Sequence, residues 1–551
     1  MAELSGAQIV ARSLQEQGVG AMFGIVGFPV VPIAIAAQRG GVPYFGFRNE
    51  QSASYAAGAY GYLTGRPGVC LAVSGPGMIH AIAGLANAQA NCWPMLLIGG
   101  ANDSFQNGMG AFQECPQIEA ARPFVKYAAR PDSIERLPYY VEQAVRASLS
   151  GRPGPVYLDL PNDQIVGKRE EQKVGWAART PEPARAQADP NAVERALEVL
   201  RAAERPLVIV GKGAAWARAE NEVREFVRRT HLPFLATPMG KGVVPDDDPL
   251  SVAPARSFAL QNADAVLLLG ARLNWILHFG LPPRFAKGVK LVQLDVCADE
   301  IGRNVPAEVA LVGDAKAVVA QLNDSLAGSK WSYPQETPWR VDLRREVAKN
   351  QESVAAMFAD DSVPMNYYRA LREIRDLLPR DAIVCSEGAN TMDIGRTVLP
   401  NFAPRHRLDA GTFGTMGVGL GFAIAAAVAE PEKKVVAVEG DSAFGFSGME
   451  FETACRYRLP ITFVILNNNG IGGGVDEIED PANVPVSVYT PRARYDKIAE
   501  AFGGRGFFVT KPAELGPALS DALASPVPTI VNVMLNPRAD RKPQKYGWLT
   551  R

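Results

Sequence analysis

Short runs of apolar residues alternate with amphipathic or small-residue segments along most of the chain. The runs 94–100, 206–211 and 434–440 read PMLLIGG, PLVIVG and KVVAVEG. Strands that are apolar on both faces are typical of parallel sheets covered by helices, and the segments 5–17 and 77–91 between such strands have helical character. The pattern therefore predicts an α/β fold built on parallel sheets.

This alternation of strands and helices is interrupted twice. Segment 168–190 is rich in charge, Pro and Ala, and segment 326–362 contains SKWSYPQETPW, so we expect both to be linkers. At about 150 residues per domain, a chain of 551 residues holds three or four domains. We predict three doubly wound parallel-sheet domains at 1–167, 191–325 and 363–535, followed by a basic tail over 536–551.

Composition excludes some classes of partner. With a net charge of −1 and 21% charged residues, the chain lacks the charge excess that favours nucleic acid or an anionic membrane. Segment 67–102 contains no Lys, Arg, Asp or Glu, but Gly75-Pro76-Gly77 and several Asn and Gln residues favour a buried strand and helix over a membrane span. Six scattered cysteines without a CxxC motif, and an N-terminus without an apolar signal core, predict a cytoplasmic protein.

Polar side chains follow two predicted strands of the last domain. Asp441 comes directly after the strand 435–440, and Asn468 ends the strand that begins at Ile461. Parallel sheets bind ligands beyond the carboxyl ends of their strands, so we expect these side chains to lie close together. Carboxylate, amide and backbone carbonyl oxygens are the ligands that Mg²⁺ prefers, which predicts a magnesium site.

This pair of segments resembles the signature of the thiamine diphosphate enzymes, Gly-Asp-X followed by Asn-Asn at a strand end. Taken separately, either segment is equally compatible with an ordinary turn. The resemblance implies that Asp441, Asn468 and the Gly470 carbonyl bind Mg²⁺, which bridges the diphosphate of the cofactor. The small residues beside Asp441 that leave room for the diphosphate are Gly440, Ser442 and Ala443.

The segment Tyr44-Phe-Gly-Phe-Arg-Asn-Glu50 resembles the place where these enzymes carry the glutamate that binds N1′ of the aminopyrimidine ring. Glu50 is therefore the candidate, and the alternative is a helix N-terminal Glu favoured by the helix dipole. In this superfamily that glutamate meets the metal site across a subunit interface. The resemblance thus implies at least a homodimer, and a homotetramer in this family.

Further cofactor contacts follow from the same resemblance. Met416 matches the apolar residue that holds the cofactor bent, within the Gly-rich run 411–419. The remaining implied contacts are Gly414 and Thr415 in that run, Ala389, Asn390 and Thr391 after the strand near 382–388, and Ile471.

The segment from Ala56 to Gly100, the run Phe112-Gln113-Glu114 and the C-terminal RKPQKYGWLTR resemble the 2-hydroxyacyl-CoA lyases and the related oxalyl-CoA decarboxylases. This implies a lyase that reversibly cleaves the C1–C2 bond of a 2-hydroxyacyl-CoA to formyl-CoA and an aldehyde or ketone, through a carbanion held by the cofactor as an enamine. Gln113 and Glu114 are the candidate polar groups on the substrate side, with Glu114 able to move a proton. Oxalyl-CoA decarboxylase activity is the alternative, although Gly472-Gly-Gly departs from the Tyr-Arg-Gly of decarboxylases.

A net-neutral protein must meet the phosphates of CoA with local cations. The candidates for acyl-CoA contacts are Phe28, Phe112, Arg396, Arg541, Lys542 and Trp548. The basic tail is also compatible with a disordered end. Oxalyl-CoA decarboxylases have an ADP pocket in the central domain, and the corresponding candidates are Arg152, Lys212, Arg272, Asp295 and Asp314. Flavin binding, or a central domain without any ligand, are the alternatives there.

Overall fold

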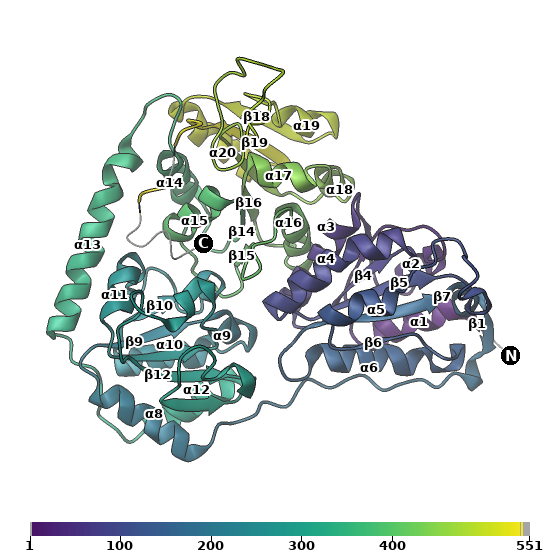
Figure 1. The fold of residues 1–551 in the computed structure, drawn as a ribbon, viewed down its shortest axis with the longest axis horizontal. Coiled ribbons are helices and arrows are strands. Elements are labelled where there is room, and N and C mark those ends of the chain that lie inside the picture. The colour runs from purple at the N-terminus through teal and green to yellow at the C-terminus, as the bar shows by residue number, and fades with distance from the viewer. Residues whose placement is uncertain (1–2, 540, 544–551) are drawn as a thin grey trace.

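The structure is a computed structural model of the chain, and it describes residues 3–539 and 541–543. It contains three parallel sheets, one in each of three successive domains, which confirms the predicted fold class. In Figure 1 the first domain lies on one side, and the central domain lies on the other side, below the third. Within the described residues, no helix has the length and apolar character needed to cross a membrane.

The first domain contains a six-stranded sheet in the order β3-β2-β4-β5-β7-β6, with all strands parallel. Its strands are β2 (Met22–Gly24), β3 (Tyr44–Gly46), β4 (Gly68–Ala72), β5 (Met95–Ala101), β6 (Ala128–Ala129) and β7 (Pro155–Pro161). Its helices are α1 (Gly6–Glu16), α2 (Val31–Arg39), α3 (Glu50–Thr64), α4 (Pro76–Asn91), α5 (Gln117–Ala121), α6 (Leu137–Leu149) and α7 (Asn162–Val166). The charge-free segment expected to be a strand, a helix and a strand forms β4, α4 and β5; both strands are buried, and α4 buries one face.

The segment after the first domain begins with a strand. β8 (Lys168–Glu170) pairs antiparallel with β1 (Glu3–Ser5), and the chain then runs without regular strands or long helices to Asp189, the N-cap of the next helix.

The central domain contains a five-stranded parallel sheet in the order β10-β9-β11-β12-β13. Its elements are α8 (Pro190–Ala202), β9 (Pro206–Val210), α9 (Lys212–Trp216), α10 (Glu220–Thr230), β10 (Phe234–Ala236), α11 (Arg256–Asn262), β11 (Ala265–Leu269), β12 (Lys290–Asp295), β13 (Val309–Val312) and α12 (Ala315–Ser325). The run 206–211, predicted as a strand, forms β9, which lies between β10 and β11 in the sheet.

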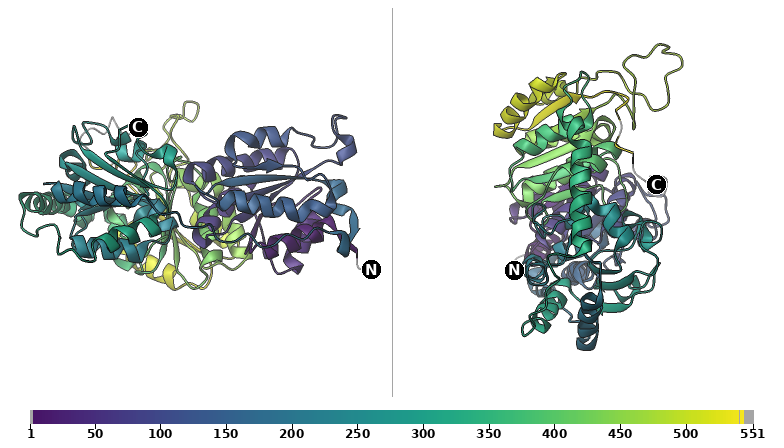
Figure 2. Two further views of the ribbon diagram at one scale, coloured as in Figure 1. Left: turned by 90° about the horizontal axis from the view of Figure 1, so that it is seen from below. Right: turned by 90° about the vertical axis from the view of Figure 1, so that its left-hand side faces the viewer.

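The connection to the third domain contains a long helix. α13 (Pro338–Ala359) begins at the N-cap Thr337, whose hydroxyl accepts a hydrogen bond from the Arg340 amide at 3.2 Å. It runs along the outside of the molecule from the central to the third domain (Figures 1 and 2). Trp339 and Leu343 are buried in the central core, so this end of the connection is packed rather than solvated.

The third domain contains a six-stranded parallel sheet in the order β15-β14-β16-β17-β19-β18. Its strands are β14 (Ile383–Glu387), β15 (Arg407–Asp409), β16 (Val435–Gly440), β17 (Thr462–Asn467), β18 (Arg505–Val509) and β19 (Thr529–Met534). Its helices are α14 (Tyr367–Leu377), α15 (Ala389–Val398), α16 (Gly419–Ala429), α17 (Asp441–Ser447), α18 (Glu450–Arg456), α19 (Asp496–Ala501) and α20 (Pro512–Ala524).

The first and third domains share one hydrophobic core. Buried side chains of α3 and α4 pack in the same cluster as those of α16 and of strands β14, β16 and β17. Figure 1 shows α3 and α4 next to α16. The two domains that carry the predicted cofactor residues are therefore docked tightly within one chain.

Candidate functional site

Three loops of the third domain converge at the carboxyl ends of adjacent strands. Glu387 of β14 lies opposite Glu439 of β16, and β16 in turn pairs with β17. A Cβ atom placed on Gly388, in the first loop, would lie 3.2 Å from the Gly440 amide of the second. The first turns of α15 and α17 contain the predicted residues Ala389, Asn390, Thr391, Ser442 and Ala443.

The third loop, after β17, is tied to the first by shared hydrogen bonds. Nδ2 of Asn468 donates to the Gly472 carbonyl at 3.1 Å, and Nδ2 of Asn390 donates to the same oxygen at 3.4 Å. The structure thus brings Asn390 and Asn468 together. Ile471, in the same loop, is 55% exposed and therefore open to a ligand.

Asp441 has the environment of a cation ligand. Its side chain is buried, Oδ1 accepts a hydrogen bond from the Ser442 amide at 2.9 Å, and Oδ2 has no hydrogen-bond partner among the described residues. Burial raises the pKa of Asp441 to about 7, because a buried carboxylate is costly without a counter-charge. A buried carboxylate oxygen without a hydrogen-bond partner among the described residues, at the end of β16 beside the loop that follows β17, fits Mg²⁺.

The Gly-rich run 411–419 is anchored from two sides. The Thr415 hydroxyl donates to Oδ1 of Asn87 on α4 at 3.0 Å, and the Gly419 amide donates to Glu387 at 2.6 Å. Gly414 has a φ of 71°, and a Cβ atom there would meet nothing within 4 Å. Met416, between these anchors, is partly exposed beside this open space.

Beneath this run lies a pair of buried carboxyl groups that the sequence did not single out. Glu387 accepts hydrogen bonds from the Gly417 and Gly419 amides, whereas neither oxygen of Glu439 has a hydrogen-bond partner among the described residues. Burial raises the pKa of Glu387 to about 8 and that of Glu439 well above its ordinary value. At neutral pH the pair therefore holds at least one proton. No local motif marks this pair, because its members lie on different strands and meet only through sheet register.

Glu50 is the first residue of α3, after the N-cap Asn49. Its Oε2 lies 3.2 Å from Nδ1 of His80 on α4. A Cβ atom on Gly77 would lie 3.2 Å from the other carboxylate oxygen, so a glycine there keeps the approach to Glu50 open. His80 is a residue that sequence reasoning missed, although it is the one titratable side chain besides Cys70 and Cys92 within 67–102.

The predicted substrate residues Phe28, Phe112 and Gln113 come from the loops that follow β2 and β5. Phe28 and Phe112 form an edge-to-face pair, with ring centroids 6.0 Å apart, and both are exposed. Oε1 of Gln113 accepts a hydrogen bond from the Ser74 hydroxyl at 3.0 Å. Gln113 directly follows Phe112 in the chain, so this amide lies on the same loop as one ring of the aromatic pair.

Glu114 is bound by the backbone of its own loop. Its carboxylate accepts hydrogen bonds from the amides of Gly108, Gly110 and Ala111 at 2.5, 2.9 and 3.1 Å. These backbone donors lower the pKa of Glu114, because they stabilise the charged form. These hydrogen bonds anchor the loop, and the expected part of Glu114 in moving a proton stays a prediction.

The two arginines predicted to bind CoA lie around one aspartate, Asp393. Arg396 pairs with Asp393 and with Asp409, each at 3.1 Å, and Arg541 pairs with Asp393 at 2.7 Å. The Lys542 amide donates to the Tyr368 hydroxyl at 3.0 Å. Arg396 is therefore engaged in ion pairs rather than presented alone to solvent. The prediction for Trp548 lies outside the described residues.

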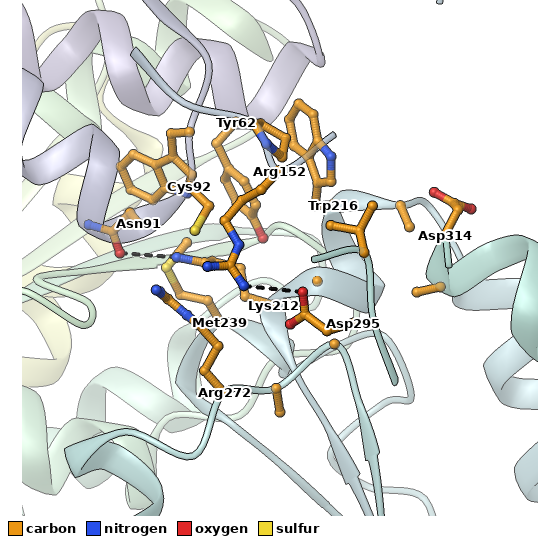
Figure 3. Close-up of a pocket in the computed structure, with 18 of the residues that line it drawn as sticks. Tyr62, Asn91, Cys92, Arg152, Lys212, Trp216, Met239, Arg272, Asp295 and Asp314 are labelled. Carbon is orange, nitrogen blue, oxygen red and sulfur yellow. Dashed lines mark hydrogen bonds and ion pairs between the residues drawn. The ribbon is translucent and has the colours of Figure 1, made fainter. Parts of the chain in front are cut away.

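A cavity of about 480 Å³ lies between the first and central domains. All five residues predicted to bind a nucleotide line it: Arg152, Lys212, Arg272, Asp295 and Asp314 (Figure 3). Nζ of Lys212 donates to Oδ1 of Asn91 at 3.1 Å, and burial lowers the pKa of Lys212 to about 7. Arg152 pairs with Asp295 at 3.2 Å, and burial raises the pKa of that aspartate.

Aromatic residues form another wall of this cavity. Tyr62 stacks on Trp93 with a centroid separation of 5.3 Å and on Trp216 at 6.5 Å. The sequence did not indicate these residues, because two of them come from the first domain and one from the central domain. Stacked rings beside basic side chains suit a planar, anionic ligand.

Comparison with known proteins defines the class. Residues 4–120, 193–322 and 387–533 match the N-terminal TPP binding domain, the central domain and the C-terminal TPP binding domain of thiamine pyrophosphate enzymes. The chain belongs to this family. Thiamine pyrophosphate is another name for thiamine diphosphate, so the match confirms the expected cofactor.

Within the family, the relatives carry two names. The chain is 52% identical to 2-hydroxyacyl-CoA lyase 1 of Homo sapiens, over 100% of this chain and 97% of the relative. It is 47% identical to 2-hydroxyacyl-CoA lyase of Oryza sativa subsp. japonica, over 98% of this chain and 96% of the relative. It is 42% identical to oxalyl-CoA decarboxylase of Escherichia coli (strain K12), over 97% of this chain and 95% of the relative. The resemblance to this group is confirmed, and the decarboxylase is the more distant of these three.

Proposed function

We propose that this chain is a Mg²⁺- and thiamine diphosphate-dependent lyase that reversibly cleaves the C1–C2 bond of a 2-hydroxyacyl-CoA. The products are formyl-CoA and an aldehyde or ketone. The observation that carries the proposal is full-length similarity, which is 52% identity to a relative named as this lyase against 42% to a named oxalyl-CoA decarboxylase. Gly472-Gly-Gly, at the loop that holds Asn390 and Asn468, also differs from the decarboxylase pattern.

The residues of the third domain fit the cofactor and its metal. Asp441, Asn468 and the Gly470 carbonyl would hold Mg²⁺, which supplies the missing partner for the buried Asp441 oxygen. When bound, thiamine diphosphate supplies a nucleophilic carbon and an electron sink for the bond that breaks. Glu50 would hydrogen-bond the pyrimidine ring through its carboxylate. His80, 3.2 Å from Glu50 and 59% exposed, can pass a proton between that carboxylate and water.

The first domain would meet the acyl group. Gln113, fixed by Ser74, orients the 2-hydroxyl of the substrate, while Phe28 and Phe112 shield the reacting carbon from water. The 2-hydroxyl loses its proton as the C1–C2 bond breaks and the carbonyl product forms, and C1 gains a proton as formyl-CoA is released. Arg541 and Lys542 are the proposed contacts for the CoA phosphates.

The remaining parts of the proposal concern assembly and regulation. We expect a homodimer at least, and a homotetramer by family resemblance, located in the cytoplasm. The cavity between the first and central domains would bind ADP, with Lys212 and Arg272 near its phosphates and Trp216 near its base.

The test supplies purified protein with Mg²⁺, thiamine diphosphate and either a 2-hydroxyacyl-CoA or oxalyl-CoA. We expect carbonyl product and formyl-CoA from the first substrate. Glu50→Ala should lower kcat at least about 100-fold, because the variant removes the carboxyl group that would exchange a proton with the pyrimidine ring. Glu500→Ala, which removes an exposed carboxylate paired with Lys497, should leave kcat unchanged.

Two outcomes would contradict the proposal. Turnover of oxalyl-CoA to CO₂ without any turnover of 2-hydroxyacyl-CoA would make the chain a decarboxylase. Full activity of Glu50→Ala on 2-hydroxyacyl-CoA would remove Glu50 from the mechanism.

A further inference from the structure

The loop that delivers Glu50 is held by a helix some 400 residues further along the chain. Glu450, the first residue of α18, accepts a hydrogen bond from the Asn49 amide at 2.9 Å. It also accepts from the Arg48 amide, at 3.1 and 3.2 Å to its two oxygens. The Glu450 side chain is buried, and the Thr453 hydroxyl donates to it at 2.7 Å. One carboxylate thus binds both amides that directly precede Glu50.

The same helix holds the loop at its other end. The Tyr457 hydroxyl accepts a hydrogen bond from the Gly46 amide at 2.6 Å, and NH2 of Arg456 donates to the Gly46 carbonyl at 2.8 Å. The Tyr457 ring packs edge-on against Phe45, with centroids 4.9 Å apart. Three side chains of one helical segment therefore bind the backbone of Gly46, Arg48 and Asn49, and they fix where α3 begins.

Burying the Glu450 carboxylate destabilises the fold unless hydrogen-bond donors compensate for the lost hydration. Burial raises the pKa of Glu450 to about 7, while the amides of Arg48 and Asn49 favour its charged form. A solvent-exposed glutamate at the first position of α18 would interact equally well with the helix dipole and would not lose its hydration. The hydrogen bonds to the loop before Glu50 therefore explain why Glu450 is buried.

α18 is also connected to the proposed metal site. α17 begins at Asp441 and ends at Ser447, and only Gly448 and Met449 separate it from Glu450. Phe444 and Phe451, one on each helix, are both fully buried. The two short helices are therefore fixed in the core, with the metal ligand at one end and the Glu50 loop at the other.

We propose that Glu450 is a positioning residue, which sets the carboxylate of Glu50 through the backbone of Arg48 and Asn49 and couples it to the Asp441 end of the cofactor site. This inference rests on the proposed role of Glu50. In the proposed dimer, where Glu50 serves the site of the partner, the same helices link the metal ligand of one site to the glutamate of the other.

The first test replaces the carboxylate with an amide, in Glu450→Gln. The substitution removes the negative charge, and an NH₂ group in place of Oε2 cannot accept from the Arg48 amide or the Thr453 hydroxyl. The hydrogen bonds of the two loop amides to the remaining oxygen are then weaker, because its acceptor is no longer charged. In the cofactor-free protein we expect faster hydrogen–deuterium exchange of the amides of Arg48 and Asn49, measured by mass spectrometry on a peptide spanning 44–52. The Glu500→Gln variant, which changes an exposed carboxylate of the same domain, should leave exchange in this peptide unchanged.

The second test separates positioning from stability. With cofactor bound and no acyl-CoA, exchange of the thiazolium C2 proton, followed by NMR, should slow about 10- to 100-fold in Glu450→Gln, because a small displacement of a catalytic group is costly. The value of kcat should fall by a similar factor, while KM for acyl-CoA stays within about threefold of wild type. Tyr457→Phe removes the acceptor for the Gly46 amide and leaves the Glu450 carboxylate in place, so it should give a smaller effect in the same direction. This variant serves if Glu450→Gln does not fold.

Wild-type C2 exchange and kcat in folded Glu450→Gln and Tyr457→Phe would overturn the inference. If Glu50→Ala itself retained wild-type C2 exchange, the proposed role of Glu50 would fail instead. The two failures are thus distinguishable.

Discussion

Lys212 illustrates how burial prepares a single side chain for an anion. Its amine lies in the cavity between the first and central domains, 3.1 Å from an asparagine oxygen and 5.5 Å from the centre of the Trp93 ring. Burial lowers its pKa from 10.5 to about 7, so the amine is only partly charged at neutral pH. A phosphate beside it would favour the charged form.

A pH dependence of nucleotide binding follows. Above pH 7 the free amine is mostly neutral, so binding of ADP must take up a proton, and the affinity should fall as pH rises, by up to about tenfold per pH unit. Isothermal titration calorimetry at several pH values on either side of 7 measures this slope. Lys212→Met should bind ADP more weakly and lose the slope. Lys497→Met, at an exposed lysine, should keep both affinity and slope, and a slope unchanged in Lys212→Met would contradict the assignment.

At the scale of elements, the docking of the first and third domains depends on a close helix crossing. A Cβ atom placed on Gly421 of α16 would lie 2.7 Å from the Ser52 carbonyl of α3 and 3.4 Å from Cβ of Tyr55. The two backbones approach each other so closely that a methyl group does not fit. Gly421 thus controls the distance between the helices.

Gly421→Ala should destabilise the protein by about 1–3 kcal/mol, because the added methyl group must push α16 away from α3. Gly445→Ala is the matched control, since a Cβ atom there meets nothing within 4 Å, and it should change stability by at most about 1 kcal/mol. Thermal unfolding followed by calorimetry measures both changes. A Gly421→Ala variant as stable as wild type would mean that the helices separate at no cost.

The sequence predicted those elements that are long enough to show a run of apolar residues or a helical period of their own. The central strands β5, β9 and β16 read as continuous apolar runs because they are buried on both faces. Edge strands such as β6 and β15 have two or three residues, too few for a pattern to emerge. α13 was expected to be part of a linker, because a largely exposed helix with charged residues resembles a solvated segment.

At the scale of the whole molecule, loops and helices of the first and third domains carry exposed apolar side chains. In the first domain they are Val26, Phe28, Val31, Ile35, Ile79, Phe105, Met109 and Phe112. In the third they are Phe413, Phe446, Met449, Ile471, Val484 and Val486. Where such side chains lie side by side, they form the kind of surface that a partner covers. They support the proposed assembly, in which loops of one chain meet those of another.

Subunit complementation tests that assembly. In the proposed dimer, each active site takes Glu50 from one chain and Asp441 from the other. A dimer of one Glu50→Ala chain and one Asp441→Ala chain therefore has two sites, of which one is intact and one lacks both residues. Co-expression with two different affinity tags and sequential purification isolates the mixed species. We expect roughly half of the wild-type kcat per chain, whereas each variant alone is inactive. Mixed species as inactive as the separate variants would show that Glu50 and Asp441 act within one chain.

The site could be predicted only as far as its residues lie in local motifs. Asp441, Asn468 and Glu50 each follow a strand, so their neighbours along the chain reveal them. Glu450 and the Glu387–Glu439 pair act through contacts that the fold creates between distant segments, and no spacing announces them. Glu114 lay within a recognised motif, but its three backbone partners became visible only in the folded loop.

The docking of α3 on α16 also bears on how the protein is made. Ser52 is synthesised 369 residues before Gly421, the difference between the two positions. At about 5–20 residues per second, the ribosome takes on the order of tens of seconds to cover that interval. Throughout that time the apolar face of α3 that later packs on α16 has no cover from its own chain, and the carboxylate that binds the amides before Glu50 has not been translated. The first domain therefore completes its core only after most of the chain has left the ribosome.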